Sequence, residues 1–146
     1  MAEEKIPENI QKKVKKDGWI RSWMMIEVLA VTENAAKSAL EKHVEKMRRE
    51  KKTIIYRKEF HEIKKVEKPI PQIETAYSNV VELELITETY DQLVYLVMNY
   101  GPSSIEILEP EKLQIDMGEA QSILNSLAEM IHKFVAAGIG GIVINT

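Results

Sequence analysis

Two carboxylates, Glu82 and Glu84, have the type and spacing in this chain that best suit chemistry. They stand two residues apart in the stretch VELEL, and residues two apart on an extended strand point to the same face. Paired carboxylates on one face can share the roles of general acid and general base. An enzyme with a carboxylate-based site on a sheet face is therefore one hypothesis. The lysine-rich segment before this stretch favours the other hypothesis, a cross-strand charge pair.

Metal and cofactor sites find no supporting pattern in the sequence. His43, His61 and His132 are not spaced four apart, no H-E-x-x-H motif is present, and the chain has no cysteine. The glycine cluster GIGG at residues 138–141 is not followed by the helix that a phosphate-binding loop needs, so we interpret it as the end of a helix. We predict no catalytic residue, no metal site and no cofactor, and we interpret the histidines as surface or boundary residues.

Nucleic-acid binding is a further hypothesis, because all but two of the 20 lysines and arginines lie in residues 1–73. A basic cluster on one face can contact phosphates. Interspersed glutamates weaken the positive charge, and the aromatic signature of RNA-binding ferredoxin-like domains is missing. The residues predicted to contact nucleic acid are Arg48, Arg49, Lys51, Lys52 and Arg57.

Length and composition favour a single globular domain. The chain has 146 residues, of which 45% are hydrophobic and 29% charged, enough for a core without disulfides. No apolar run approaches the roughly 20 residues of a membrane span, and the N-terminus lacks the apolar core of a signal peptide. We therefore expect a cytoplasmic protein that does not bind membranes.

Hydrophobic periodicity predicts alternating strands and helices that position these residues. Their order, β-α-β-β-α-β, predicts an α+β fold with a ferredoxin-like antiparallel sheet. We divide the chain into an N-terminal arm at 1–17, a core at 18–115, and a long helix with an apolar tail at 116–146. The arm is expected to be solvated and partly frayed, or to form a short helix that begins at Pro7 with Ile10 and Val14 as its apolar stripe. The expected elements are strands at residues 19–31, 53–67, 79–88 and 103–108, and helices at 33–51, 90–100 and 117–137. The segment between 67 and 79 is expected to be a long connection or an edge ribbon.

A local resemblance supports this fold. The succession of a helix, YGP, the strand SIEILEPEKL and a second helix resembles the C-terminal extension of WYL-domain transcriptional regulators, although Gln114 stands where that family has an arginine. The resemblance implies a small ferredoxin-like module of the regulatory type. The residues that carry it are Gly101, Ile105, Ile107, Leu108, Pro110 and Leu113.

An excess of apolar residues predicts self-association. The strand at 19–31 is apolar on both faces, whereas two helices cover only one face of a sheet. The last helix should therefore cover the bare face of its own sheet or dock on a second copy. We expect a non-enzymatic, ligand- or protein-binding regulatory module that forms homo-oligomers, with a small molecule or protein as a further partner. The predicted interface residues are Leu124, Leu127, Ile131 and Phe134.

Overall fold

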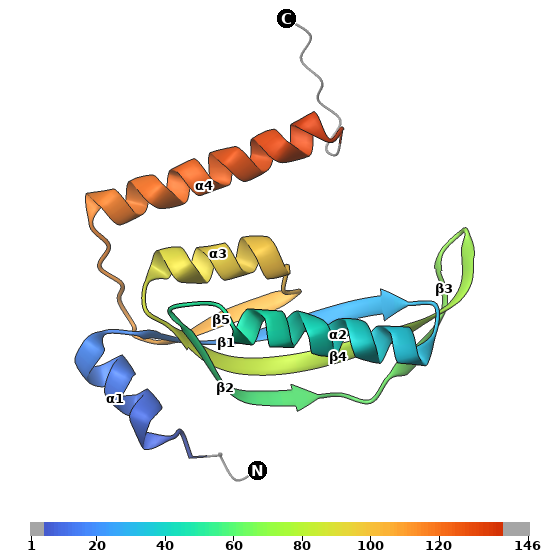
Figure 1. The fold of residues 1–146 in the computed structure, drawn as a ribbon, viewed down its shortest axis with the longest axis horizontal. Helices are drawn as coiled ribbons and strands as arrows, with labels where there is room; N and C mark the ends of the chain where they lie inside the picture. The colour runs from blue at the N-terminus through green and yellow to red at the C-terminus, as the bar shows by residue number, and fades with distance from the viewer. Residues whose placement is uncertain (1–4, 139–146) are drawn as a thin grey trace, which may run out of the picture.

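An antiparallel sheet of five strands organises residues 5–138, the part of the chain that this computed structural model describes (Figure 1). Four helices accompany the sheet, so the fold is α+β as predicted. The elements follow in the order α1 Glu8–Asp17, β1 Ile20–Ala30, α2 Glu33–Arg48, β2 Thr53–Phe60, β3 Lys64–Ile70, β4 Ile73–Thr87, α3 Tyr90–Tyr100, β5 Ser104–Glu109 and α4 Met117–Ala136.

The strand order is that of the ferredoxin-like arrangement. The main path runs β2-β4-β1-β5, with β1 and β4 in the centre and β2 and β5 at the edges. Helix α2 connects β1 to β2, and α3 connects β4 to β5. This topology confirms the predicted fold class, with α4 appended after β5.

The expected strand at residues 53–67 is in fact two strands. β2 ends at Phe60, and β3 forms a hairpin with the first half of β4, as the alternative of an edge ribbon predicted. Pro69 is tolerated because β3 is an edge strand and its register shifts between Glu67 and Ile70. β4 is therefore long enough to pair first with β3 and then with β2.

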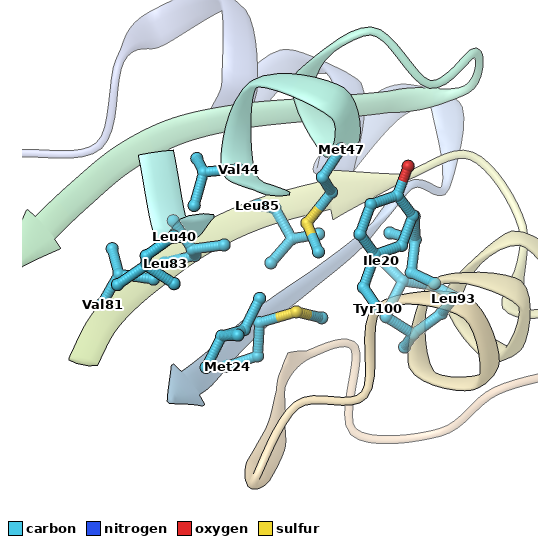
Figure 2. Close-up of a cluster of buried hydrophobic side chains, with 12 residues drawn as sticks. Ile20, Met24, Leu40, Val44, Met47, Val81, Leu83, Leu85, Leu93 and Tyr100 are labelled. Atoms are coloured by element: carbon cyan, nitrogen blue, oxygen red, sulfur yellow. The ribbon is translucent and has the colours of Figure 1, made fainter. Parts of the chain in front are cut away.

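The hydrophobic core lies between the sheet and the helices α2 and α3 (Figure 2). The predicted apolar stripe of α2, from Ala36 through Leu40 and Val44 to Met47, is buried along its whole length. In Figure 2, Leu93 and Tyr100 of α3 lie beside Ile20 at one end of the cluster. The remaining members of the cluster are Met24, Ile26, Val81, Leu83, Leu85 and Leu96.

Side-chain caps define the helix starts that the sequence predicted. Thr32 Oγ1 accepts a hydrogen bond from the Ala35 amide at 3.0 Å, and Thr89 Oγ1 accepts one from the Gln92 amide at 3.1 Å. The carboxylate of Asp116 caps α4 in the same way. Gly101 ends α3 at φ 57°, a left-handed conformation that glycine adopts without strain.

Each terminal helix decides between two alternatives. Residues 8–17 form α1 after Pro7, with Ile10 only 2% exposed, so the alternative of a short helix is confirmed and the frayed arm is wrong. α4 lies over α3 on the helical side of the sheet, so it does not cover the bare face and that alternative is wrong (Figure 1). Two hydrogen bonds join α4 to α3 there: Glu119 accepts one from the Asp91 amide at 3.0 Å, and Ser122 donates one to the Asp91 carboxylate at 3.1 Å. The apolar tail at 139–146 lies outside the described residues.

Candidate functional site

The face of the sheet that α2 and α3 leave uncovered carries a polar network, here called the polar face. The register places Trp23 of β1 opposite Glu84 of β4, and Arg57 of β2 on the other side of Glu84. Arg21 lies on the same face, two residues before Trp23. The central strands therefore bring a carboxylate between two arginines.

Three donors engage the carboxylate of Glu84. Tyr56 donates to Oε1 at 2.9 Å and Arg21 donates to the same oxygen at 3.3 Å, while Arg57 donates to Oε2. Arg21 also donates to Glu109 at 2.8 Å, which ties β5 into the network. Burial raises the pKa of Tyr56 to about 12, and its hydrogen bond to Glu84 adds to this rise. Both oxygens of Glu84 are thus engaged by the protein's own donors.

The second carboxylate, Glu82, pairs with a histidine and a tryptophan. His61 Nε2 lies 2.6 Å from Oε2, and Trp23 Nε1 donates to Oε1 at 3.1 Å. The hydrogen bond with His61 is the main cause that lowers the pKa of Glu82. A hollow of about 250 Å³ on this face is lined by Trp23, Glu84, Glu106 and Leu108, and it takes in neither Glu82 nor His61.

Glu84 forms the expected cross-strand charge pair, with Arg57 of β2 as its partner in place of a lysine, while Glu82 pairs with His61, just after β2, through a hydrogen bond. Sequence reasoning missed the roles of Arg21 and Tyr56. The signal for Arg21 was its two-residue spacing from Trp23 on β1, and Tyr56 depended on a bulge at residues 55–57 that no local pattern marks.

A second surface is the apolar groove, a space of about 540 Å³ between α3, β5 and α4. Ile105 and Ile107 of β5 pair with Met24 and Ser22 of β1, so they point to the helical side of the sheet. The side chains that line the groove include Val94, Val97, Ile105, Ile107, Leu127 and Phe134.

The predicted interface residues share one stripe of α4, and the structure divides them into two pairs. Leu127 and Phe134 line the apolar groove. Leu124 and Ile131 do not, and they are 62% and 60% exposed. No residue of α4 is buried, which is unusual for a helix with so many large apolar side chains.

A third surface, the basic groove, lies where the end of α2 meets α3 and encloses about 800 Å³. Of the five predicted nucleic-acid contacts, Arg49, Lys51 and Lys52 line it. Arg48 is held by Glu45 next to the groove, with contacts of 2.9 and 2.6 Å. Arg57 lies on the polar face, because the bulge in β2 turns it toward Glu84. The full lining is Lys42, Glu45, Lys46, Arg49, Glu50, Lys51, Lys52, Gln92 and Tyr95.

The other two histidines, His43 and His132, lie away from the polar face. His43 Nε2 lies 2.8 Å from the carbonyl oxygen of Tyr100, and the two rings meet edge to face at 5.1 Å. His132 is exposed on α4. Within residues 5–138, no group of three or more histidine, aspartate or glutamate side chains is placed to hold a metal ion.

None of the helices in the described part of the chain combines the length and hydrophobicity that crossing a membrane requires.

Comparison with known proteins gives one match. The chain matches no curated protein and no solved structure. Residues 21–144, which include all of the sheet except Ile20, match the model of the MJ0538 family. Because the match covers most of the sequence, the chain belongs to the MJ0538 family.

Proposed function

We propose that this protein is a non-enzymatic binding module that works as a homo-oligomer, with α4 as the contact between subunits. The observation that carries the proposal is the state of α4. It buries none of its residues, and Leu124 and Ile131 project into solvent. Large apolar side chains gathered on one exposed helix face usually mark an interaction surface.

A second copy of the same chain is the partner that fits this surface. The exposed stripe of α4 continues into the apolar groove through Leu127 and Phe134, so one chain supplies both an apolar ridge and an apolar recess. In a two-fold dimer the same patch of each subunit forms the interface, so the patch must be complementary to itself. A ridge and a recess on one chain meet this requirement.

The two edges of the sheet differ in how open they are to pairing with another chain, and this difference favours an interface on the side of β5 and α4. The β2–β3 edge carries Lys58, Lys64, Lys65 and Pro69, which are residues that discourage pairing with another chain. The β5 edge, with the sequence SIEILE, has neither lysine nor proline and lies next to the apolar groove. An open edge beside an exposed apolar stripe favours an interface there.

A binding role, as opposed to an enzymatic one, is supported by the polar face. A general acid or base needs a free oxygen that a substrate can reach. Glu84 is engaged by Tyr56 and two arginines, and Glu82 is engaged by His61 and Trp23. These pairs are sufficient to explain the carboxylates as part of the sheet's stability.

The regulatory character and the cytoplasmic location are further parts of the proposal. The local resemblance of residues 100–113 to the extension of WYL-domain regulators favours a regulatory module. A small molecule or a protein could bind in the apolar groove at the junction of two subunits, where pockets commonly form. The lack of cysteine favours a reducing compartment such as the cytoplasm.

The absence of native cysteine makes a clean test available. Light scattering should give a mass above the 16.8 kDa of one chain. The variant Leu124→Cys or Ile131→Cys should form disulfide-linked dimers under mild oxidation, whichever lies nearer the two-fold axis, because a disulfide needs Cα atoms within about 7 Å. The matched variants Asn125→Cys and His132→Cys, on the polar side of α4, should not. A monomer at all concentrations would overturn the proposal, and crosslinking of the matched variants as efficient as that of the stripe variants would remove the stripe of α4 as the contact.

A further inference from the structure

The basic groove has an excess of positive charge that its own carboxylates do not balance. Glu45 accepts hydrogen bonds from Arg48, and these are the main cause that lowers the pKa of Glu45 to about 2. Arg49 also lies 3.5 Å from the Glu45 carboxylate. Glu50 accepts hydrogen bonds from the hydroxyl of Tyr100 at 2.7 Å and from that of Tyr95 at 3.5 Å. Both acidic side chains of the groove are therefore already engaged.

Four lysines of the groove are left without such partners. Within residues 5–138, none of Lys42, Lys46, Lys51 and Lys52 forms an ion pair. The negative end of the α2 dipole lies nearby, but two of these lysines follow the last turn of the helix and extend the charge beyond it. Four ammonium groups around one recess repel each other unless an anion lies between them.

The backbone at Lys52 supports a role for its side chain. Its φ is 60°, in the left-handed region where glycine or asparagine is the usual residue. The Lys52 carbonyl accepts a hydrogen bond from the Glu88 amide at 3.0 Å, which fixes this turn. The turn therefore holds Lys52 at a fixed place on the groove wall.

The groove also offers an aromatic surface. Tyr95 of α3 lines the groove and is 42% exposed, which is unusual for a tyrosine with its hydroxyl engaged at the groove wall. Gln92 beside it donates to Thr53 Oγ1 at 3.0 Å, so its position is fixed. A lysine-lined recess with a half-exposed ring is the combination that binds single-stranded nucleic acid, phosphates on lysines and a base on the ring.

From this we infer that the basic groove binds single-stranded nucleic acid. A base can stack on the ring of Tyr95, a contact that neither a lipid headgroup nor an acidic side chain makes. The inference does not depend on the homo-oligomer, because every residue that lines the groove comes from α2, α3 or the segment between α2 and β2 of one chain.

Fluorescence anisotropy of the full chain with labelled oligonucleotides of about 12 nucleotides tests the inference. Oligouridylate and oligothymidylate distinguish RNA from DNA as the source of the same chemistry. With four lysine contacts, the logarithm of the binding constant should fall with the logarithm of the salt concentration with a slope of about −3. No binding at about 0.05 M salt, or binding without salt dependence, would overturn the inference.

Substitutions then locate the site. Lys46→Gln with Lys51→Gln should weaken binding about 25-fold at 0.1 M salt and make the slope about 1.4 less steep, since each phosphate contact contributes about fivefold. The matched control is Lys64→Gln with Lys65→Gln on β3, which removes the same charge outside the groove. Equal losses in the two double variants would overturn the placement in the groove.

Two further variants separate binding from folding. Lys52→Gly should leave the thermal unfolding temperature unchanged or higher, because it relieves the left-handed backbone, while it weakens binding about fivefold. Tyr95→Ala should weaken binding about tenfold and Tyr95→Phe should not, because only the ring is needed for stacking. Stronger binding to phosphatidylserine vesicles or to polyglutamate than to either oligonucleotide would overturn the assignment to nucleic acid.

Discussion

Replacing Leu124 and Ile131 together by glutamine should dissociate the homo-oligomer and leave the folded domain intact. Both side chains lie on the outer stripe of α4 and are about 60% exposed in the single chain. Glutamine is a good helix former, so α4 itself should persist. Only the apolar area available to a partner is removed.

The magnitude follows from the exposed area. Full burial of a leucine or isoleucine contributes about 1.5–3 kcal/mol, so covering the exposed part of each should contribute about 1–2 kcal/mol. In a two-fold dimer each residue counts once in each subunit, which gives about 4 kcal/mol or more for the pair. A loss of this size weakens the dimer about 1000-fold. The free energy of unfolding should change by less than about 0.5 kcal/mol, because neither residue packs in the core.

Sedimentation velocity from about 1 µM to about 100 µM measures the change directly. The matched control is Asn125→Gln with His132→Gln, on the polar side of the same helix, which should leave assembly unchanged. If the double variant of the stripe assembles like the wild type, α4 is not the contact. If the control dissociates equally, the effect comes from the helix as a whole and the reasoning from exposed area is refuted.

Three further predictions concern the sheet and the turns. Glu84→Gln should lower the free energy of unfolding by about 2 kcal/mol, because it leaves two arginines facing each other. The control Glu67→Gln, at an exposed ion pair, should lower it by less than about 0.5 kcal/mol. Equal losses of the two variants in chemical denaturation would contradict this. Burial raises the pKa of Tyr56 to about 12 in the folded protein, above the ordinary 10.0 of the phenol, so the wild type should lose stability as pH rises from 10 to 12. Tyr56→Phe should lose less stability over that range. Phenolate absorbance measures the pKa, and chemical denaturation at each pH measures the stability. Gly101→Ala should cost about 1–2 kcal/mol because φ is 57°, while Gly118→Ala, in the first turn of α4, should not lower the melting temperature.

The sequence predicted those parts of the fold that local patterns encode. The buried stripe of α2, the apolar sequence of β1 and the cap of α2 at Thr32 each depend on residues within or next to one element, whereas the cap of α3 could be Thr87 or Thr89 until the structure showed Thr89. The β3–β4 hairpin was less clear, because Pro69 and its neighbouring lysines resemble a connection when the pairing partner is unknown. Only the pairing of these residues with β4 identifies them as a strand.

The candidate surfaces depended more on tertiary structure. The bulge in β2 places Arg57 on the polar face and removes it from the basic cluster that its sequence neighbours predicted. Helix α4 is joined to α3 by a hydrogen bond between Glu119 and Asp91, which are 28 residues apart. Neither contact has a periodic signal. The apolar stripe itself could be read from the sequence, but the side of the sheet on which it lies could not.

The length of β4 has a consequence for local unfolding. At 15 residues it spans about 50 Å, and its two halves have different neighbours. Residues 81–87 pair with both β1 and β2 and pack under the helices, while residues 73–76 pair with β3 alone; Tyr77 and Ser78 lie between them and pair with both β1 and β3. Amide protons at 81–87 should therefore exchange with solvent only through global opening, whereas those at 73–76 should exchange through a separate, smaller fluctuation. One continuous strand would thus belong to two cooperative units.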